Sequence, residues 1–213
     1  MKYLIAIPCM DMVHTVFLKS LIGLDKPDDT KFGLTCSSLV YDARNTLARK
    51  AMDEGYDRVL WLDSDMEFDS DLMKRLAADM DEGIDFVAGL YFKRKAPVIP
   101  VIYKEVGYYK GVDETVTPIA VSFEDYPLDQ IFEIAGAGFG GCMVSVDLIR
   151  KVTEKHGLPF SPILGFGEDL SFCKRVEDVG GKMYCDSRVK LGHVGLASVT
   201  ESVYLSQRGE KQC

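Results

Sequence analysis

The sequence predicts a single α/β domain with a mostly parallel sheet, helices on both faces and added β-hairpins. Two patterns indicate this class. Short apolar runs alternate with amphipathic helical patterns over residues 3–91, which is typical of a right-handed, parallel α/β unit. Residues 97–135 instead carry short β-like runs separated by Gly, Pro and acidic loops, which indicates hairpins joined to that sheet.

The elements expected in the first 91 residues follow from the apolar pattern. The run at residues 3–7 is rich in β-branched and aromatic types and stops at Pro8, as a buried strand leading into a loop does. Over residues 38–54, apolar positions recur every fourth residue and Gly55 follows, which predicts an amphipathic helix. In chain order we expect strand, loose helix, polar loop, helix, strand, helix and strand at residues 3–7, 11–24, 25–31, 38–54, 58–62, 70–82 and 85–91.

The second half of the chain combines helices with short strands. Helical patterns occupy Val146–His156 and Glu168–Val179. Strand-like runs are expected at residues 98–103, 119–123, 131–134, 142–146, 182–185 and 189–193. Because no linker, internal repeat or low-complexity tract interrupts the chain, we predict one domain over residues 1–195 and a loosely attached tail over residues 196–213.

Composition narrows the class of protein. The 213 residues are 47% apolar and 27% charged, enough to bury a core, so intrinsic disorder is excluded. The net charge of -8 argues against a protein that holds nucleic acid mainly by neutralising phosphates, because that mechanism needs clustered Lys and Arg. Local binding of a phosphate through a metal ion stays open.

Cysteine use and hydropathy predict a cytoplasmic protein. The six cysteines form no C-x-x-C pair and most lie in apolar stretches, so we interpret them as reduced core thiols rather than a disulfide or zinc framework. Pro8 and Asp11 break the N-terminal apolar run, which argues against a signal peptide. No stretch approaches the roughly 18 apolar residues of a membrane span.

Two carboxylates follow directly after the predicted strand at residues 58–62. Asp63 and Asp65 stand where open α/β sheets bind ligands, and residues two apart in an extended chain point the same way. Their mutual repulsion would be relieved by a divalent cation, and Mg²⁺ or Mn²⁺ prefers oxygen ligands shared with a substrate phosphate. The alternative is that both acids are helix caps or solvated loop residues.

A second acidic pair begins a predicted helix. Glu168 and Asp169 follow two glycines, and the helix dipole favours negative charge at this position. A carboxylate in a partly enclosed site of this kind can serve as a general base toward a hydroxyl group. Capping of the helix by the same pair is the structural alternative.

A histidine and a glycine-rich run complete the candidate site. His193 lies between glycines after a strand, and neutral imidazole is a good ligand for Mn²⁺, although a lone histidine is more often structural. Four glycines occur within residues 136–141, where either a close approach to a ligand or a bulged strand explains them. No P-loop or dinucleotide fingerprint is present.

Together, in this order, these motifs resemble the GT-A fold nucleotide-sugar glycosyltransferases. The resemblance rests on the strand ending in Ile7-Pro8, Ala43-Arg44-Asn45, Asp63-Ser64-Asp65, the glycine-rich run, Gly167-Glu168-Asp169 and Gly192-His193. It is strongest with the inverting family 2 enzymes and covers roughly residues 3–195. It implies a GT-A (Rossmann-like) catalytic domain.

The resemblance also implies roles for the acids and the histidine. Asp65 would bind the Mn²⁺ or Mg²⁺ ion that bridges the diphosphate of the donor, and Asp63 would contact the ribose or, through water, the same ion. His193 would be a further metal ligand. Asp169 would be the catalytic base and Glu168 would shape the acceptor site, with the choice of base between these two left open.

Two more residues are assigned to the donor in the same way. Pro8 and the loop after it would touch the nucleotide base, and Arg44 would approach the base or the phosphates. The reaction implied is transfer of one sugar, most simply from a UDP-hexose, to an acceptor hydroxyl with inversion. The Gln207-Arg208-Gly209 segment lacks the Trp of the Q-x-x-R-W motif of processive synthases, which favours single transfers.

Two other functions remain open from the residues alone. A nucleotidyltransferase also places acids and a metal at strand ends, but the loop after the first strand lacks the glycine and basic residues usual there. A non-catalytic module that binds sugar nucleotides would keep the fold with a degraded site. The acceptor is unidentified; a nucleic acid acceptor is not favoured by the acidic charge, nor is it excluded.

Overall fold

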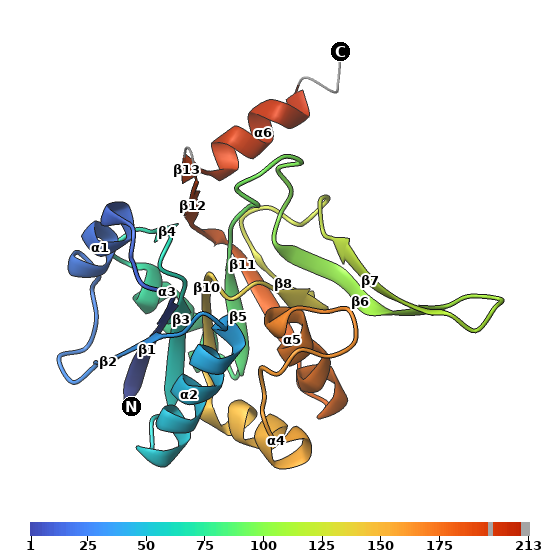
Figure 1. The fold of residues 1–213 in the computed structure, drawn as a ribbon. Helices are drawn as coiled ribbons and strands as arrows, with labels where there is room; N and C mark the ends of the chain where they lie inside the picture. Colours follow the sequence, from blue (N-terminus) through green and yellow to red (C-terminus); the bar gives the residue numbers. More distant parts are fainter. Residues whose placement is uncertain (196–197, 210–213) are drawn as a thin grey trace.

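The computed structural model describes residues 1–195 and 198–209, and its centre is a seven-stranded sheet (Figure 1). The strand order is β2-β1-β3-β10-β5-β11-β8. The register pairs show that β10 and β8 run against the other five strands, so the sheet is mostly parallel, as predicted. The strands are β1 (Tyr3–Cys9), β2 (Lys31–Cys36), β3 (Arg58–Leu62), β5 (Phe86–Leu90), β8 (Ile131–Ile134), β10 (Gly141–Ser145) and β11 (Met183–Lys190).

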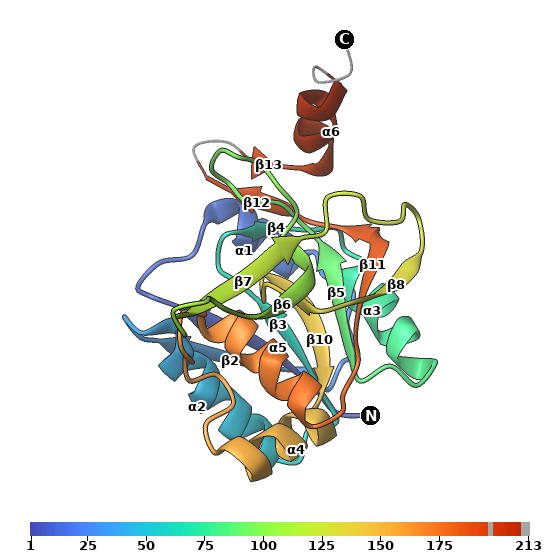
Figure 2. The same cartoon turned by 90° about the vertical axis from the view of Figure 1, so that its right-hand side faces the viewer.

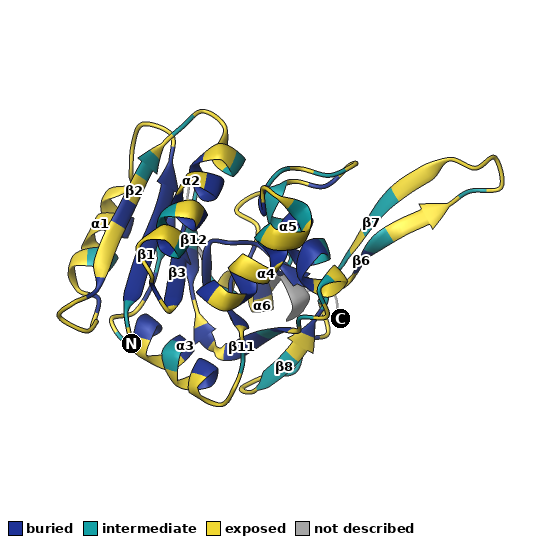
Figure 3. Ribbon diagram, turned by 90° about the horizontal axis from the view of Figure 1, so that it is seen from below, coloured by how far each residue is buried: buried dark blue, intermediate teal, exposed yellow. Residues whose placement is uncertain are grey.

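Helices cover both faces of this sheet, because the central strands are apolar on both sides (Figures 2 and 3). In β1, Leu4 and Ala6 belong to the core under one set of helices, while Ile5 and Ile7 belong to the core under the other set. The first set is α2 (Val40–Asp53), α4 (Val146–His156) and α5 (Glu168–Asp178), and the second is α1 (Thr15–Ile22) and α3 (Leu72–Asp81). The predicted helices at residues 146–156 and 168–179 are therefore confirmed to within one residue.

The predicted hairpins form a small sheet of their own. Strands β6 (Ile102–Lys110) and β7 (Val116–Ser122) pair in antiparallel fashion, and β9 (Gly136–Ala137) pairs with β6. The outer end of the hairpin is exposed and projects from the domain (Figure 3). The hairpin is longer than the runs expected at residues 98–103 and 119–123, since polar residues extend both strands past the apolar core.

Strand β2 was not predicted, and its burial pattern gives the reason. It is an edge strand on which Phe32 and Leu34 are exposed while Gly33 is buried, so it has no continuous apolar core. A Cβ atom on Gly33 would lie 2.7 Å from a methyl carbon of Leu47 on α2, which explains a glycine inside this strand. Similarly, the loose helix expected at residues 11–24 begins only at Thr15.

A second three-stranded sheet, with order β13-β12-β4, closes one end of the domain. It consists of β4 (Met66–Glu67), β12 (Gly192–Val194) and β13 (Ser198–Val199), and α6 (Glu201–Gly209) follows it. The ring of Tyr204 on α6 stacks on Phe92 with centroids 4.4 Å apart. Residues 196–197 and 210–213 of the predicted tail lie outside the described residues, and the division of the chain at residue 195 stays a prediction.

Of the predicted core thiols, four are buried and one is exposed. Cys9, Cys142, Cys173 and Cys185 are buried free thiols, whereas Cys36 is exposed with its Sγ atom 3.4 Å from that of Cys9. Cys213 lies outside the described residues. In the part of the chain that the structure describes, no helix combines the length and the apolar character needed to cross a bilayer.

Asp79 on α3 and Asp186 on β11 share the guanidinium group of Arg188. This arrangement predicts that the stability of the protein depends on pH. Arg188 donates to both oxygens of Asp186, at 2.8 and 3.0 Å, and to Oδ1 of Asp79 at 3.2 Å. Burial, together with the neighbouring Asp186, raises the pKa of Asp79 to about 7. The folded state therefore binds this proton more tightly than the unfolded state, and stability falls as pH rises from the usual carboxyl range through about 7.

We expect Asp79→Asn to stabilise the protein increasingly as pH rises, because asparagine mimics the protonated carboxyl group at every pH. The gain should be on the order of 1–2 kcal/mol larger at about pH 8 than at about pH 5. Urea unfolding at both values measures it. Asp53→Asn, at an exposed position on α2, is the control and should change stability equally at both. A gain from Asp79→Asn that does not vary with pH would contradict the prediction.

Candidate active site

A cleft of about 460 Å³ opens at the carboxyl ends of β1 and β3. This is the edge at which open α/β sheets bind ligands. The structure brings together in its wall every residue predicted for the site: Pro8, Arg44, Asp63, Asp65, Glu168, Asp169 and His193. They come from β1, α2, the turn after β3, the start of α5 and β12.

The guanidinium group of Arg44 lies at the floor of the cleft and is only 1% exposed. Its Nη2 atom is 2.9 Å from Oδ1 of Asp63 and 3.2 Å from Oδ1 of Asp169, and its Nε atom donates to Glu168 at 3.4 Å. Burial lowers the pKa of Arg44, but the charges of these three carboxylates outweigh it and raise the pKa further above its ordinary value. Arg44 is therefore the buried counter-charge of the acidic cluster, and its contact with a nucleotide stays a prediction.

Asp63 and Asp65 follow β3 in a turn and have different partners. Asp63 is turned toward Arg44, and burial, partly offset by that arginine, raises its pKa. Asp65 contacts the guanidinium group of Arg94, and its Oδ2 atom is 3.5 Å from Nε2 of His193. Burial raises the pKa of Asp65, but His193 and Arg94 outweigh it and leave the pKa below its usual value.

His193 lies on β12, opposite Met66 of β4, and this pairing brings it beside Asp65. Its Nδ1 atom is 2.9 Å from the carbonyl oxygen of Phe92. Since a carbonyl oxygen only accepts, Nδ1 carries a proton, and in the neutral ring Nε2 then presents a lone pair toward the carboxylate of Asp65. Two acceptor atoms that face each other need a proton or a cation between them.

The donor set around Asp65 fits a divalent cation. A carboxylate oxygen and an imidazole nitrogen are suitable ligands for Mn²⁺, and the hydrogen bond from Nδ1 of His193 to a backbone carbonyl is the usual orientation of a metal-binding histidine. Among residues 1–195 and 198–209, no three His, Cys, Asp or Glu side chains form a complete cage. An ion with one or two protein ligands that takes the others from substrate phosphates needs no such cage.

Asp169 and Glu168 occupy the first turn of α5, where the helix dipole favours negative charge. Oδ2 of Asp169 accepts a hydrogen bond of 3.3 Å from the backbone N–H of Phe139, while Oδ1 is turned inward toward Arg44. Oδ2 is therefore the oxygen that can reach a ligand. Burial raises the pKa of Asp169 to about 8, and the charges of Glu168 and Asp63 add to this while Arg44 opposes it.

Tyr91 is a cleft residue that the sequence did not reveal. It follows β5 directly, is 4% exposed, and accepts a hydrogen bond of 3.2 Å from the backbone N–H of Gly140. Burial, with the charges of Asp169 and Asp63, raises its pKa well above the ordinary value, so the hydroxyl group stays protonated and can donate. An aromatic residue at the end of an apolar strand gives no sequence signal that separates this position from the core.

The glycine-rich run makes room for protein side chains. A Cβ atom on Gly138 would lie 2.0 Å from the hydroxyl oxygen of Tyr91, and one on Gly141 would lie 2.3 Å from a methyl carbon of Leu191. These close contacts are with protein side chains, and the close approach to a ligand stays a prediction. Tyr91 and Leu191 fill the space that these two glycines leave.

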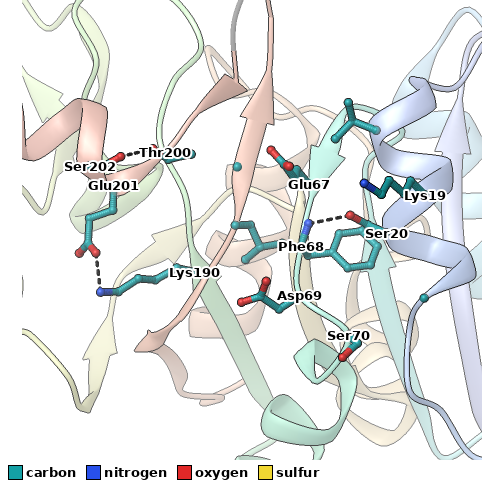
Figure 4. A pocket seen from close by; sticks show the side chains of 14 residues that line it. Lys19, Ser20, Glu67, Phe68, Asp69, Ser70, Lys190, Thr200, Glu201 and Ser202 are labelled. Atoms are coloured by element: carbon teal, nitrogen blue, oxygen red, sulfur yellow. Dashed lines mark hydrogen bonds and ion pairs between the residues drawn. The ribbon is translucent and has the colours of Figure 1, made fainter.

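A larger cavity of about 660 Å³ lies between α1, β4, β12 and the start of α6 (Figure 4). Its walls contain a hydrogen bond of 3.1 Å from the backbone N–H of Phe68 to Ser20 and an ion pair of 2.5 Å between Lys190 and Glu201. None of the residues predicted for the site lines it. The clustered acids and the histidine, rather than the volume, therefore identify the smaller cleft as the candidate active site.

Comparison with known proteins gives matches by structure alone. No protein-family model and no curated protein sequence matches the chain. The structure of A197 from STIV is similar with a TM-score of 0.67 and 20% identity, over 92% of this chain and 86% of that one. GalNAc-T7 with UDP, GalNAc and Mn²⁺ is similar with a TM-score of 0.52 and 13% identity, over 89% of this chain and 37% of that one.

TarS from S. aureus, residues 1–349 in complex with UDP-GlcNAc, is similar with a TM-score of 0.53 and 17% identity. That match covers 87% of this chain and 56% of TarS, so the present chain spans only part of GalNAc-T7 and of TarS. At these identities the likeness establishes the fold. The chain therefore has the mixed α/β fold, with a mostly parallel central sheet flanked by helices, of GT-A glycosyltransferase structures.

Proposed function

We propose that the protein is a metal-dependent, non-processive glycosyltransferase that moves one sugar from a nucleotide-diphosphate sugar to an acceptor hydroxyl group with inversion. One observation carries the proposal: acids and a histidine from the turn after β3, the start of α5 and β12 line a single cleft at the ligand-binding edge of a GT-A fold. GalNAc-T7 and TarS, which share this fold, were crystallised with UDP and with UDP-GlcNAc. A UDP-hexose is accordingly the donor to test first.

The donor would lie across the carboxyl ends of β1 and β3. Pro8 and the loop after it would contact the nucleotide base, and Asp63 would approach the ribose. Asp65 and His193 would hold Mn²⁺ or Mg²⁺ against the diphosphate. When bound, the ion would supply positive charge that stabilises the leaving nucleoside diphosphate.

Asp169, which pairs with Arg44 through Oδ1, would accept the proton of the attacking hydroxyl group at Oδ2. The backbone N–H of Phe139 orients this oxygen, and Arg44 holds the inner oxygen, so the carboxyl group cannot rotate away. A pKa of about 8 brings the base close to the operating pH, where a general base is most effective. Attack from the face opposite the leaving group inverts the anomeric carbon in one displacement, and Glu168 would shape the acceptor side of the cleft.

We expect UDP to stabilise the protein against heat only when Mn²⁺ or Mg²⁺ is present. With ligand at about 100 times its Kd, the rise in Tm should be about 5–10 °C. Differential scanning fluorimetry with UDP plus metal, UDP plus chelator and metal alone measures it, and a panel of other nucleoside diphosphates identifies the preferred base. Asp65→Asn should abolish most of the shift, whereas Asp53→Asn should keep it. Equal stabilisation by UDP in the presence of chelator would refute a metal-bridged site.

A further inference from the structure

The loop between Tyr91 and Val101 concentrates positive charge at the mouth of the cleft. Lys93, Arg94 and Lys95 are the only three consecutive basic residues in a chain with a net charge of -8. The base of the loop is fixed, because Lys93 donates a backbone hydrogen bond of 3.0 Å to Ile99 and Val101 donates one of 3.0 Å to Tyr91. Residues 93–97, at its tip, are exposed. The charged side chains can therefore change partners without any change in the sheet.

Arg94 contacts the carboxylate oxygen of Asp65 that would coordinate the metal ion. Its guanidinium group pairs with Oδ2 of Asp65, the same oxygen that lies 3.5 Å from Nε2 of His193. In the described structure, this arginine supplies positive charge at the carboxylate oxygen that faces the imidazole. A guanidinium group and a divalent cation cannot both occupy that position, since their like charges would repel each other at contact distance.

The charge balance of the cleft indicates where Arg94 goes when the cation arrives. Asp63, Glu168 and Asp169 share the buried Arg44 as their counter-ion, whereas Asp65 pairs at the mouth with Arg94, which is 44% exposed. A nucleoside diphosphate would bring further negative charge to the same mouth. A guanidinium group binds phosphate oxygens in a bidentate manner, which makes the diphosphate the natural next partner of a displaced Arg94.

We propose that Arg94 is a displaceable counter-ion of Asp65, which the divalent cation replaces and which then binds the diphosphate of the donor. The inference rests on the proposed function for its second step only. Competition between Arg94 and the cation for Asp65 requires no nucleotide and can be measured in its absence. The two steps therefore have separate measurements.

The first measurement is Mn²⁺ binding without nucleotide, followed by electron paramagnetic resonance of the free ion. Arg94→Ala should bind Mn²⁺ about five- to tenfold more tightly than the unsubstituted protein, because the competing cation is gone. Lys95→Ala is the matched control: it removes the same charge from the same loop, at a residue that does not line the cleft, and should change Mn²⁺ affinity less than twofold. Equal or weaker Mn²⁺ binding by Arg94→Ala, or no binding by either protein, overturns the proposal.

The second measurement is UDP binding at saturating Mn²⁺, by calorimetry. Arg94→Ala should weaken it roughly tenfold, Arg94→Lys should recover part of the loss, and Lys95→Ala should have a smaller effect. Unchanged UDP affinity in Arg94→Ala overturns the second step. If the unsubstituted protein binds Mn²⁺ but no nucleoside diphosphate, the proposed function fails, whereas tighter Mn²⁺ binding by Arg94→Ala would still support the first step.

Discussion

Replacing Asp169 with asparagine is expected to lower the rate of sugar transfer about 10²- to 10⁴-fold and to leave donor binding intact. Asparagine keeps the shape of the side chain and can still accept the hydrogen bond from Phe139, but it cannot take up a proton. Turnover of a nucleotide sugar that carries the base selected by the nucleoside diphosphate panel, measured beside its affinity by calorimetry, separates the two effects. Unchanged turnover would remove Asp169 from the role of base.

Two variants on the same helix sharpen this test. Glu168→Gln changes the neighbouring acid, and a larger loss of turnover there than in Asp169→Asn would transfer the role of base to Glu168. Asp178→Asn is the matched control at the far end of α5, where the carboxylate pairs with Lys155 at 2.8 Å, and it should leave turnover unchanged.

The pH profile gives a second readout for the same residue. A base must be deprotonated to act, so kcat/KM should fall as pH drops below the pKa of Asp169 in the free protein, which is about 8. This acidic limb lies far above the usual range of a carboxyl group. A limb that lies near pH 4, as for an ordinary exposed carboxylate, would show that another group limits the reaction.

Much of the fold could be predicted because its central strands are buried on both faces. Residues 3–7, 59–62 and 86–91 are buried and carry no charged side chain, as a strand covered on both sides requires. Strand β2 could not be predicted in the same way, since an edge strand needs only one apolar face. The order of the strands was also hidden, because β10 enters between β3 and β5 in antiparallel fashion through contacts far apart in the chain.

The candidate site could be predicted to the extent that its residues follow strands or begin helices. Asp63 and Asp65 follow a strand, so their place at the ligand-binding edge of the sheet followed from the elements alone. Asp169 begins a helix, and only the resemblance implied that it belongs to the same site. Tyr91 and Arg94 could not be found, since their roles depend on which side chains meet across the cleft. The role of Arg44 as the shared counter-ion of three carboxylates was missed for the same reason. Nothing in the apolar pattern of a helix shows that one of its side chains pairs with three acids from other segments.

The largest loss of stability is expected from Arg44→Met. Removing the guanidinium group leaves Asp63, Glu168 and Asp169 without their shared counter-charge, and breaking a buried ion pair in this way costs about 3–5 kcal/mol. Contacts of the guanidinium carbon with the rings of Phe139, at 5.2 Å, and Trp61, at 6.0 Å, are lost as well. Urea unfolding at about pH 9, above the pKa of about 8 of Asp169, measures the change.

Controls on the same helix and in the same cluster decide whether charge is the cause. Arg49→Met, at an exposed position of α2, should change stability by less than about 0.5 kcal/mol. Adding Asp169→Asn to Arg44→Met should recover part of the loss, because one of the unpaired carboxylates is then neutral, and lowering the pH should reduce the loss by protonating all three. If Arg44→Met were as stable as Arg49→Met, the carboxylates would not depend on Arg44, and the arginine would be free to bind the nucleotide as its position in the sequence motif implies.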